Sequence, residues 1–284
     1  MDTIRYTFLI DTLVTHGKNF LFVGPTGTGK TAYIKRHVAS GIDSELYSYT
    51  FMNFSAQTSA NMTQDIVDGK LDKRKKGTFG PPPGKKMIVF VDDLNMPQVE
   101  EYGAQPPIEL LRQFMDYSGW DDRRELTFRN LVDMQFIAAM GPPGGGRNNV
   151  TNRYLRHYHV ICATPFNAAT LTKIFSTLVE WWMRTKGLPE ELHECQSSLV
   201  KGTIELYQTV QRELLPTPMK SHYTFNLRDV SKVFQGVCST TKESVADKGS
   251  LTRLWVHESL RVFADRLTDE PDRRWFFDMS KRLT

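Results

Sequence analysis

The sequence predicts an α/β region with a mostly parallel β-sheet, followed by a smaller region built only of helices. In the first 165 residues, short apolar runs alternate with helical patterns and with loops rich in glycine and proline. Strands that alternate with helices are typical of a parallel sheet with helices on both faces. After Thr164 and Pro165 only helical spacing remains. We therefore expect one subdomain at 1–165 and a second at 166–284.

Five apolar runs are expected to form the strands of this sheet. In chain order they are Phe20–Val23, Leu46–Phe54, Met87–Val91, Met134–Ala139 and Tyr158–Cys162. Helical patterns lie between them at Lys30–Ala39, Thr58–Asp68 and Pro107–Tyr117. Two stretches, 71–86 and 118–133, interrupt the alternation, and we interpret them as surface insertions that can form hairpins. The first is basic and rich in proline, and the second contains a short strand candidate at 126–128.

The second region is expected to consist of helices separated by proline-containing turns. Its first helix has apolar residues at helical spacing as far as Trp182, and Asn167 is a suitable N-cap for it. Further helices are expected at Pro189–Leu215, Leu227–Val237, Leu251–Leu267 and Asp272–Lys281.

Composition and charge argue against several other classes of protein. The chain has 284 residues, 40% hydrophobic and 24% charged, which is the balance of a folded globular protein. Its 36 basic and 32 acidic side chains leave a net charge of +4, too small to indicate nucleic-acid binding. No apolar run approaches the ~20 residues that a membrane span needs. The three scattered cysteines favour a reducing compartment over a disulfide framework. We expect neither a membrane nor a nucleic-acid partner.

One segment matches a phosphate-binding loop at every fixed position. It reads GPTGTGKT, fits the pattern GxxxxGK[ST], follows the strand at 20–23 and opens the next helix. Its residues are Gly24, Pro25, Thr26, Gly27, Thr28, Gly29, Lys30 and Thr31. Glycines let backbone N–H groups close round a phosphate, and the helix N-terminus adds positive potential. We expect Lys30 to reach the β- and γ-phosphates of ATP, or the phosphates of ADP, and Thr31 to offer its hydroxyl to Mg²⁺.

Two carboxylates, Asp92 and Asp93, follow the apolar strand at 87–91. Ligands of open α/β sheets bind at the carboxyl ends of the strands. We therefore expect Asp92 to hold Mg²⁺, either as a ligand or through water. Asp93 is expected to orient and polarise the water that attacks the nucleotide.

The phosphate loop, the acidic strand end and the trailing helices together resemble the AAA+ ATPases. Longer stretches resemble the third AAA+ module of dynein heavy chains, in their axonemal branch. These stretches are GPTGTGKT at 24–31, FVDDLNMP at 90–97, YGAQPPIELLR at 102–112, AAMGPPGGGR at 138–147, NRYLR at 152–156 and HYTFNLR at 222–228. The resemblance covers essentially the whole chain. It implies a P-loop AAA+ large domain with a five-stranded sheet and a C-terminal helical small subdomain.

The resemblance implies roles for three further residues. Arg228 matches the position from which such helical subdomains contact the γ-phosphate, the sensor-2 position. Arg153 matches the arginine finger that acts on the nucleotide of a neighbouring module, with Arg156 as the near alternative. Ile4 lies where the N-terminal segment of such modules passes the adenine, and is implied as a packing contact.

Two positions depart from the general AAA+ pattern. Asp93 stands where related ATPases usually carry glutamate, and is shorter by one C–C bond, about 1.5 Å. Gly141 ends the fourth strand, where such enzymes usually carry Asn or Thr to place the lytic water. Asn148 and Asn149 can reach back there only if their loop folds inward. Both departures predict slow turnover without predicting weak binding.

We therefore expect an ATP- and Mg²⁺-binding AAA+ module whose slow hydrolysis regulates microtubule-based motility. One alternative is a module that holds nucleotide structurally without turnover, and another is an independent P-loop enzyme such as a kinase or a nucleic-acid remodeller. The resemblance implies partners within the dynein complex: the neighbouring AAA+ modules and the linker of the same heavy chain, and other dynein subunits. It implies only indirect contact with microtubules, insertions that approach the linker, and a location in the cytoplasm and cytoskeleton, in the axoneme of a cilium or flagellum.

Overall fold

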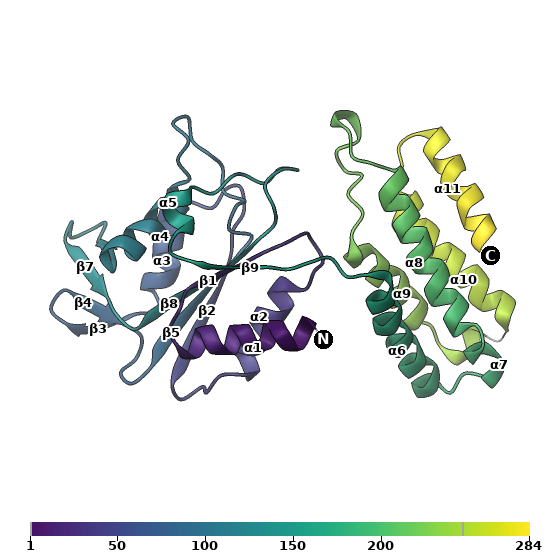
Figure 1. Ribbon diagram of the computed structural model, residues 1–284, viewed down its shortest axis with the longest axis horizontal. Helices are drawn as coiled ribbons and strands as arrows, with labels where there is room; N and C mark the ends of the chain where they lie inside the picture. The colour runs from purple at the N-terminus through teal and green to yellow at the C-terminus, as the bar shows by residue number, and fades with distance from the viewer. Residues whose placement is uncertain (1, 246) are drawn as a thin grey trace. The chain divides into compact units, whose positions relative to one another are not determined.

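The computed structural model describes residues 2–245 and 247–284, and the chain divides between Thr164 and Pro165 into two compact units. All the strands of the described residues lie in the first unit, and the described part of the second unit is built from helices and the segments that connect them (Figure 1). Among the described residues, no helix is both long enough and apolar enough to cross a bilayer.

A five-stranded parallel sheet forms the centre of the first unit and confirms the predicted fold class. Its strands are β1 (Phe20–Val23), β2 (Tyr47–Asn53), β5 (Lys86–Asp92), β8 (Met134–Met140) and β9 (His159–Cys162). Each coincides with a predicted strand, and the ends differ by one residue at most. The order across the sheet is β2-β5-β8-β1-β9, and every neighbouring pair is parallel. The carboxyl ends of all five strands therefore meet at one edge.

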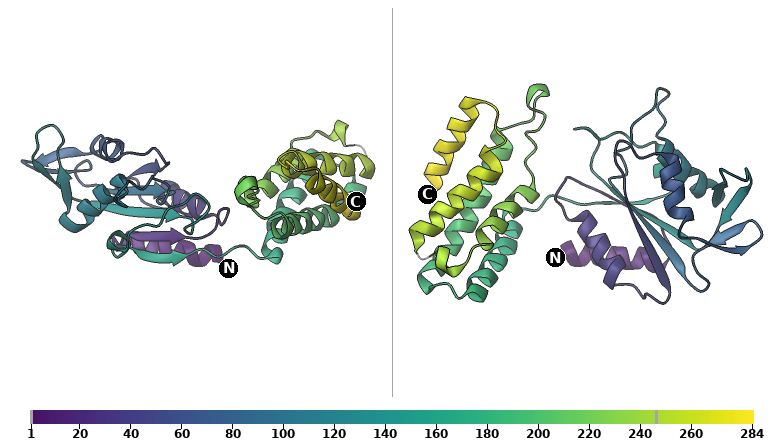
Figure 2. Two further views of the ribbon diagram at one scale, coloured as in Figure 1. Left: turned by 90° about the horizontal axis from the view of Figure 1, so that it is seen from above. Right: turned by 180° about the vertical axis from the view of Figure 1, so that it is seen from behind.

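Helices cover both faces of this sheet, as Figures 1 and 2 show. They are α1 (Asp2–Thr15), α2 (Lys30–Ser40), α3 (Ala60–Asp68) and α4 (Pro106–Tyr117). Successive strand residues point to opposite faces. Thus Phe22 and Ile88 are buried in the core formed with α1 and α2, whereas Leu21 and Val89 are buried in the core formed with α3 and α4. Burial on both faces explains why these strands are continuous apolar runs.

Helix α1 was not among the expected elements. Its inner face carries Ile10 and Val14, which are buried, but Ile4 and Phe8 on the outer side are 73% and 67% exposed. Because apolar residues occur on both sides, the helical period is obscured in the sequence. Gln135 of β8 holds the end of this helix, since its side-chain amide donates to backbone oxygens at the end of α1 and just beyond it.

Each of the two insertions forms an antiparallel pair of strands, as expected, and the two pairs join in a second, four-stranded sheet. Its strands are β3 (Asp72–Lys75), β4 (Thr78–Gly80), β6 (Gly119–Asp121) and β7 (Phe128–Leu131), in the order β3-β4-β7-β6. The central pair is parallel, with Phe79 opposite Leu131. The strand expected at 126–128 begins two residues later, at Phe128, because Leu126 lies in the turn before β7 with φ 51° and is 83% exposed. Strands β3 and β4 thus occupy part of the basic stretch.

The second unit packs its helices round one apolar core. They are α6 (Ala168–Lys186), α7 (Glu190–His193), α8 (Gln196–Glu213), α9 (Leu227–Cys238), α10 (Lys248–Ser259) and α11 (Glu270–Leu283), with short turns η1 (Pro218–Lys220), η2 (Lys242–Ser244) and η3 (Leu260–Ala264). Asn167 is the N-cap of α6, as predicted, and accepts a hydrogen bond from the N–H of Thr170 at 2.8 Å. The helix expected at 189–215 is divided into α7 and α8, and the one expected at 251–267 passes from α10 into the π-helical turn η3.

Candidate nucleotide-binding site

The predicted phosphate loop connects β1 to α2. Gly29 is the N-cap of α2 with φ 81°, a left-handed conformation that glycine adopts without strain. The Lys30 ammonium donates to the backbone oxygens of Gly24 and Pro25, each at 2.7 Å. It also lies 3.4 Å from Thr28 Oγ1. The ammonium is therefore held against the loop that opens onto a helix N-terminus, where anions are favoured.

Asp92, the last residue of β5, contacts the end of this loop. Thr31 Oγ1 donates to Asp92 Oδ2 at 2.8 Å, across 61 residues of sequence. The backbone N–H of Asp93 donates to the other Asp92 oxygen at 3.1 Å. The sheet and α2 thus bring a hydroxyl and a carboxylate together, and oxygen groups of this kind are the ligands that Mg²⁺ prefers.

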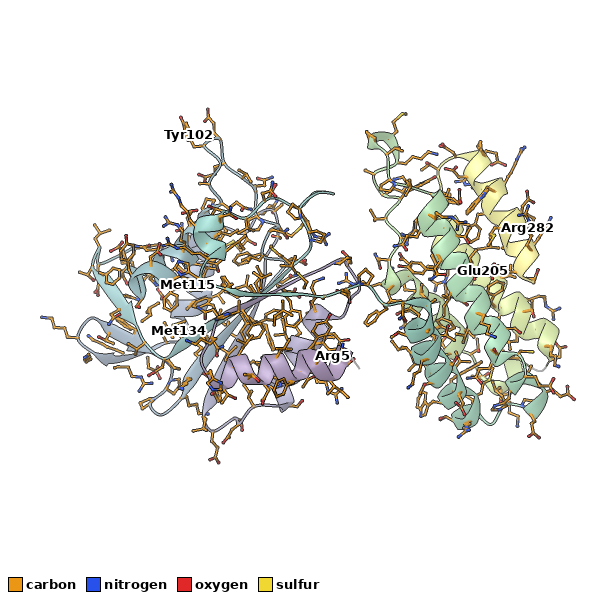
Figure 3. The ribbon with its side chains drawn as sticks, viewed as in Figure 1. Arg5, Tyr102, Met115, Met134, Glu205 and Arg282 are labelled. Carbon is orange, nitrogen blue, oxygen red and sulfur yellow. The ribbon has the colours of Figure 1, made fainter. Side chains whose placement is uncertain are left out.

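Asp93 leaves the strand in a left-handed conformation, with φ 52°. Few residues other than glycine adopt this conformation, and aspartate is one of the more tolerant. The backbone oxygen of Asp93 accepts from the N–H of Met96 at 3.0 Å, and the chain then runs out to Tyr102, which is 92% exposed (Figure 3). Within residues 2–245 and 247–284 the half-buried Asp93 carboxylate has no hydrogen-bond or ion-pair partner. It is free to accept a proton or a hydrogen bond from a ligand.

The end of β8 has no polar side chain at Gly141, and neither nearby asparagine replaces one. Asn148 donates through Nδ2 to the backbone oxygen of Pro97 at 2.7 Å, so the loop after β5 holds its amide. Asn149 is exposed. Neither of these two asparagine side chains therefore takes the place of the polar residue at Gly141.

Arg147, which was not predicted, lies over Gly141 instead. Its Nη2 donates to Thr26 Oγ1 in the phosphate loop at 3.0 Å. A Cβ atom at Gly141 would lie only 2.6 Å from Arg147 Nε, so the side chain packs against this glycine. The sequence feature that could have indicated this contact is the run of three glycines before Arg147. Such a run lets the chain turn back toward Gly141, which has no side chain.

The two arginines expected near the fourth strand differ in their surroundings. Both lie at α5 (Asn152–Leu155), where Tyr154 between them is fully buried. Arg156 donates to Asp116 Oδ1 on α4 at 2.5 Å, and His157 Nε2 lies 3.0 Å from the same oxygen. Arg153 is exposed, and its side chain has no partner in the described part of the chain.

The two remaining expected residues lie at helix starts. Ile4 is exposed on α1, and two residues later the ring of Tyr6 packs against Tyr33 of α2, with ring centroids 5.7 Å apart. This end of α1 therefore lies beside the helix that the phosphate loop opens. In the second unit, the N–H of Arg228 donates to the N-cap Asn226 at 2.8 Å, and the arginine is exposed on the first turn of α9. Contact of Ile4 or Arg228 with a nucleotide stays a prediction.

The residues at this edge of the sheet fit a nucleoside triphosphate with Mg²⁺. Strands β5, β8 and β1 are neighbours, so the loops that follow them converge. They bring two cations, Lys30 and Arg147, to the place where phosphate oxygens would bind. Thr31 and Asp92 supply oxygen ligands for Mg²⁺, and Asp93 supplies a carboxylate without a partner among the described residues.

The parallel sheet has a phosphate loop after β1 and an acidic pair at the end of β5, with β8 between these two strands, and a helical region follows. Together these features define a P-loop module of the AAA+ class. Residues 1–166 match the family described as the P-loop containing dynein motor region, and residues 199–283 match the AAA+ lid domain. The chain belongs to this dynein motor-region family, as its sequence motifs predicted. An independent kinase or nucleic-acid remodeller is thereby set aside.

Several curated dynein heavy chains are similar to this chain over its whole length. Human dynein axonemal heavy chain 12 is 52% identical over 283 residues, which are 100% of this chain and 9% of that protein. Human dynein axonemal heavy chain 1 is 50% identical over 294 residues, 99% of this chain and 7% of that protein. Human dynein axonemal heavy chain 3 is 50% identical over 284 residues, 100% of this chain and 7% of that protein. The chain thus spans less than a tenth of the length of these relatives.

The ion pair that holds Arg156 predicts an acidic titration for Asp116. The hydrogen bond from the Arg156 guanidinium holds the pKa of Asp116 below its usual value and the adjacent His157 adds to the effect, although partial burial opposes it. Because the folded-state pKa is lowered, the pair stabilises the fold above the ordinary aspartate pKa. That contribution is lost as the pH falls through the lowered value.

Nuclear magnetic resonance titration of the Asp116 carboxyl carbon measures this effect. In Arg156→Gln the midpoint should rise toward the ordinary aspartate value of about 3.9. Arg153→Gln removes the same charge three residues earlier and should leave the midpoint unchanged. If Arg156→Gln left it unchanged too, Asp116 would not be holding Arg156 in solution.

Proposed function

We propose that this chain is an ATP- and Mg²⁺-binding AAA+ module of an axonemal dynein heavy chain, and that it hydrolyses ATP slowly. The observation that carries the proposal is the 2.8 Å hydrogen bond between Thr31 Oγ1 and Asp92 Oδ2, next to a lysine held on the phosphate loop. A hydroxyl and a carboxylate so close together, beside a cation, match the requirements of a triphosphate with its metal.

In this proposal the phosphate loop binds the phosphates, and the hydroxyl at its end binds Mg²⁺ together with the carboxylate at the end of β5. Lys30 exchanges its bonds to loop carbonyl groups for bonds to the β- and γ-phosphate oxygens. Thr31 and Asp92 hold Mg²⁺, which when bound neutralises charge on those oxygens. Ile4 packs against the adenine, and Arg228 approaches the γ-phosphate from the helical unit.

Hydrolysis in this proposal depends on Asp93 as the general base. Its carboxylate accepts a proton from the water that attacks the γ-phosphorus, and no described residue competes for that carboxylate. Two features favour a low rate: aspartate is one methylene shorter than glutamate, and Gly141 offers no amide or hydroxyl to position the water. The same features support the second candidate function, a module that holds nucleotide without turnover.

The family match supports a place for this module inside a dynein heavy chain, at the third position of the AAA+ ring. There it would control the motor through changes in the angle between its two units. Arg153 would reach the nucleotide of the preceding module, and the sheet formed by β3, β4, β7 and β6 would face the linker. Other dynein subunits would be further partners, contact with microtubules would be indirect, and the location would be the axoneme of a cilium or flagellum.

Lys30→Ala should weaken ATP binding by roughly a hundredfold, because it removes the cation that pairs with the phosphates. Titration of the 284-residue chain with a fluorescent ATP analogue measures the affinity. Lys35→Ala is the matched control, since Lys35 is an exposed lysine of the same helix and its removal should change the affinity less than about twofold. A folded Lys30→Ala variant that bound ATP as tightly as the wild type would refute the assignment of the phosphate loop.

Asp93→Asn should lower the rate of hydrolysis by roughly a hundredfold, because it keeps the size of the side chain and removes its basicity. Asparagine also tolerates the left-handed conformation at this position. Asp93→Glu should raise the rate, provided that its melting temperature shows that the backbone accepts glutamate. Single-turnover hydrolysis with the neighbouring module present measures all three rates. Equal rates for Asp, Asn and Glu would favour the structural nucleotide holder.

Arg153→Ala should leave the ATP affinity of this module unchanged and slow hydrolysis in the preceding module of a heavy chain. Losses on the order of 10³ follow removal of an arginine finger in phosphoryl-transfer enzymes. Arg156→Ala, which breaks the pair with Asp116, is expected to leave that hydrolysis rate unchanged. Should Arg156→Ala slow the preceding module and Arg153→Ala have no effect, the finger is Arg156.

A further inference from the structure

We infer that Arg147 binds the terminal phosphate of the nucleotide, in the place that the missing side chain of Gly141 leaves open. This inference rests on the proposed function, since it names a further binding residue of the same site. The side chain of Arg147 packs on Gly141, the residue that follows β8. Strand β8 lies between β1, which leads into the phosphate loop, and β5, which ends at Asp92.

Backbone hydrogen bonds determine the position of Arg147. The N–H of Gly144 donates to the backbone oxygen of Arg147 at 3.0 Å, and the N–H of Arg147 donates back to Gly144 at 3.2 Å, which closes a tight hairpin. The next N–H, of Asn148, donates to the backbone oxygen of Asn95 at 3.0 Å, and the Asn95 amide donates to Gly141 at 2.9 Å. The hairpin is thus tied both to the loop after β5 and to the end of β8.

The side chain then fills the space over the glycine. Arg147 Nε, Cζ and Cδ would lie 2.6, 2.7 and 2.8 Å from a Cβ at Gly141. Any residue other than glycine would therefore displace the guanidinium. The arginine is within reach of the phosphate loop only because position 141 has no side chain.

The charge of Arg147 lacks a counter-ion among the described residues. Its one hydrogen bond there is from Nη2 to Thr26 Oγ1, at 3.0 Å, and no carboxylate pairs with it. Its Nε is buried with no acceptor within residues 2–245 and 247–284. A guanidinium has five N–H donors, and a half-buried cation with most of them unused is stabilised by an anionic ligand. Phosphate oxygens suit it, because they accept two parallel bonds from arginine.

The geometry selects the terminal phosphate among the three. The guanidinium of Arg147 contacts the phosphate loop at Thr26, and it packs at the end of β8, the strand next to β5, which ends at Asp92. The phosphate between a phosphate loop and the carboxylates that hold the metal and the attacking water is the γ-phosphate. Arg147 there adds positive charge and cannot accept a proton. It therefore strengthens binding of the triphosphate without replacing a group that positions water.

Affinities for a non-hydrolysable ATP analogue and for ADP, measured with the 284-residue chain in Mg²⁺, test this inference. Arg147→Gln should weaken binding of the analogue by about tenfold and binding of ADP by less than about twofold. Gly141→Ala should shift the affinities in the same direction, because its methyl group displaces the guanidinium while the charge stays in the chain. Arg36→Gln removes an exposed arginine of α2 and serves as the matched control, with both affinities unchanged.

The outcomes separate this inference from the proposed function. If the wild-type chain bound neither nucleotide, the proposed function would fail and this inference with it. If the wild type bound both, and Arg147→Gln and Gly141→Ala bound the analogue normally, only the role of Arg147 would be overturned. An equal loss of analogue and ADP affinity would also overturn it, because the contact would then not be with the terminal phosphate. Gly141→Ala decides the question by itself if Arg147→Gln does not fold.

Discussion

The hydrogen bond between Thr31 and Asp92 depends on the register of three parallel strands. Ile137 of β8 lies opposite Phe20 of β1 on one side and Phe90 of β5 on the other. The carboxyl ends of all three strands therefore lie nearly level along the strand direction, and the loops that follow them lie close together. A shift of one residue in any strand would turn its buried side chains to the other face. The same apolar alternation that fills the two cores thus fixes the positions of the polar groups at the sheet edge.

The site has more groups that hold an anion than groups that could activate water. Lys30, Arg147 and the start of α2 all contribute positive charge, whereas Asp93 is the one carboxylate at the edge with no partner among the described residues. Its left-handed backbone sets the direction in which its short side chain leaves the strand. Gly141 provides no polar side chain at the end of β8, and the space that it leaves is filled by the guanidinium of Arg147. The two departures from the general AAA+ pattern therefore leave this edge with more positive charge than groups that could position water.

Local sequence patterns predicted the features that depend on neighbouring residues. The five strands and the phosphate loop fall into this group, because apolar runs and the spacing of fixed residues specify them. Pairing of β4 with β7 was missed because it joins segments about 50 residues apart, which no local pattern shows. Helix α1 was missed because exposed apolar residues obscured its period. Arg147 was missed because its position depends on a hairpin that folds back onto Gly141 after β8. The roles of Ile4, Arg153 and Arg228 depend on a ligand or on other parts of the chain, so they stay predictions.

The measurement that tests the central claim most directly is the Mg²⁺ dependence of ATP binding. Calorimetric titration of the 284-residue chain with ATP, in Mg²⁺ and in excess chelator, compares the two affinities. We expect ATP to bind more tightly in Mg²⁺, and Asp92→Asn to remove most of that difference, since the proposed function assigns the metal to Asp92 and Thr31. Equal wild-type affinities with and without Mg²⁺, or no binding in either, would contradict a nucleotide site built round the contact between Thr31 and Asp92.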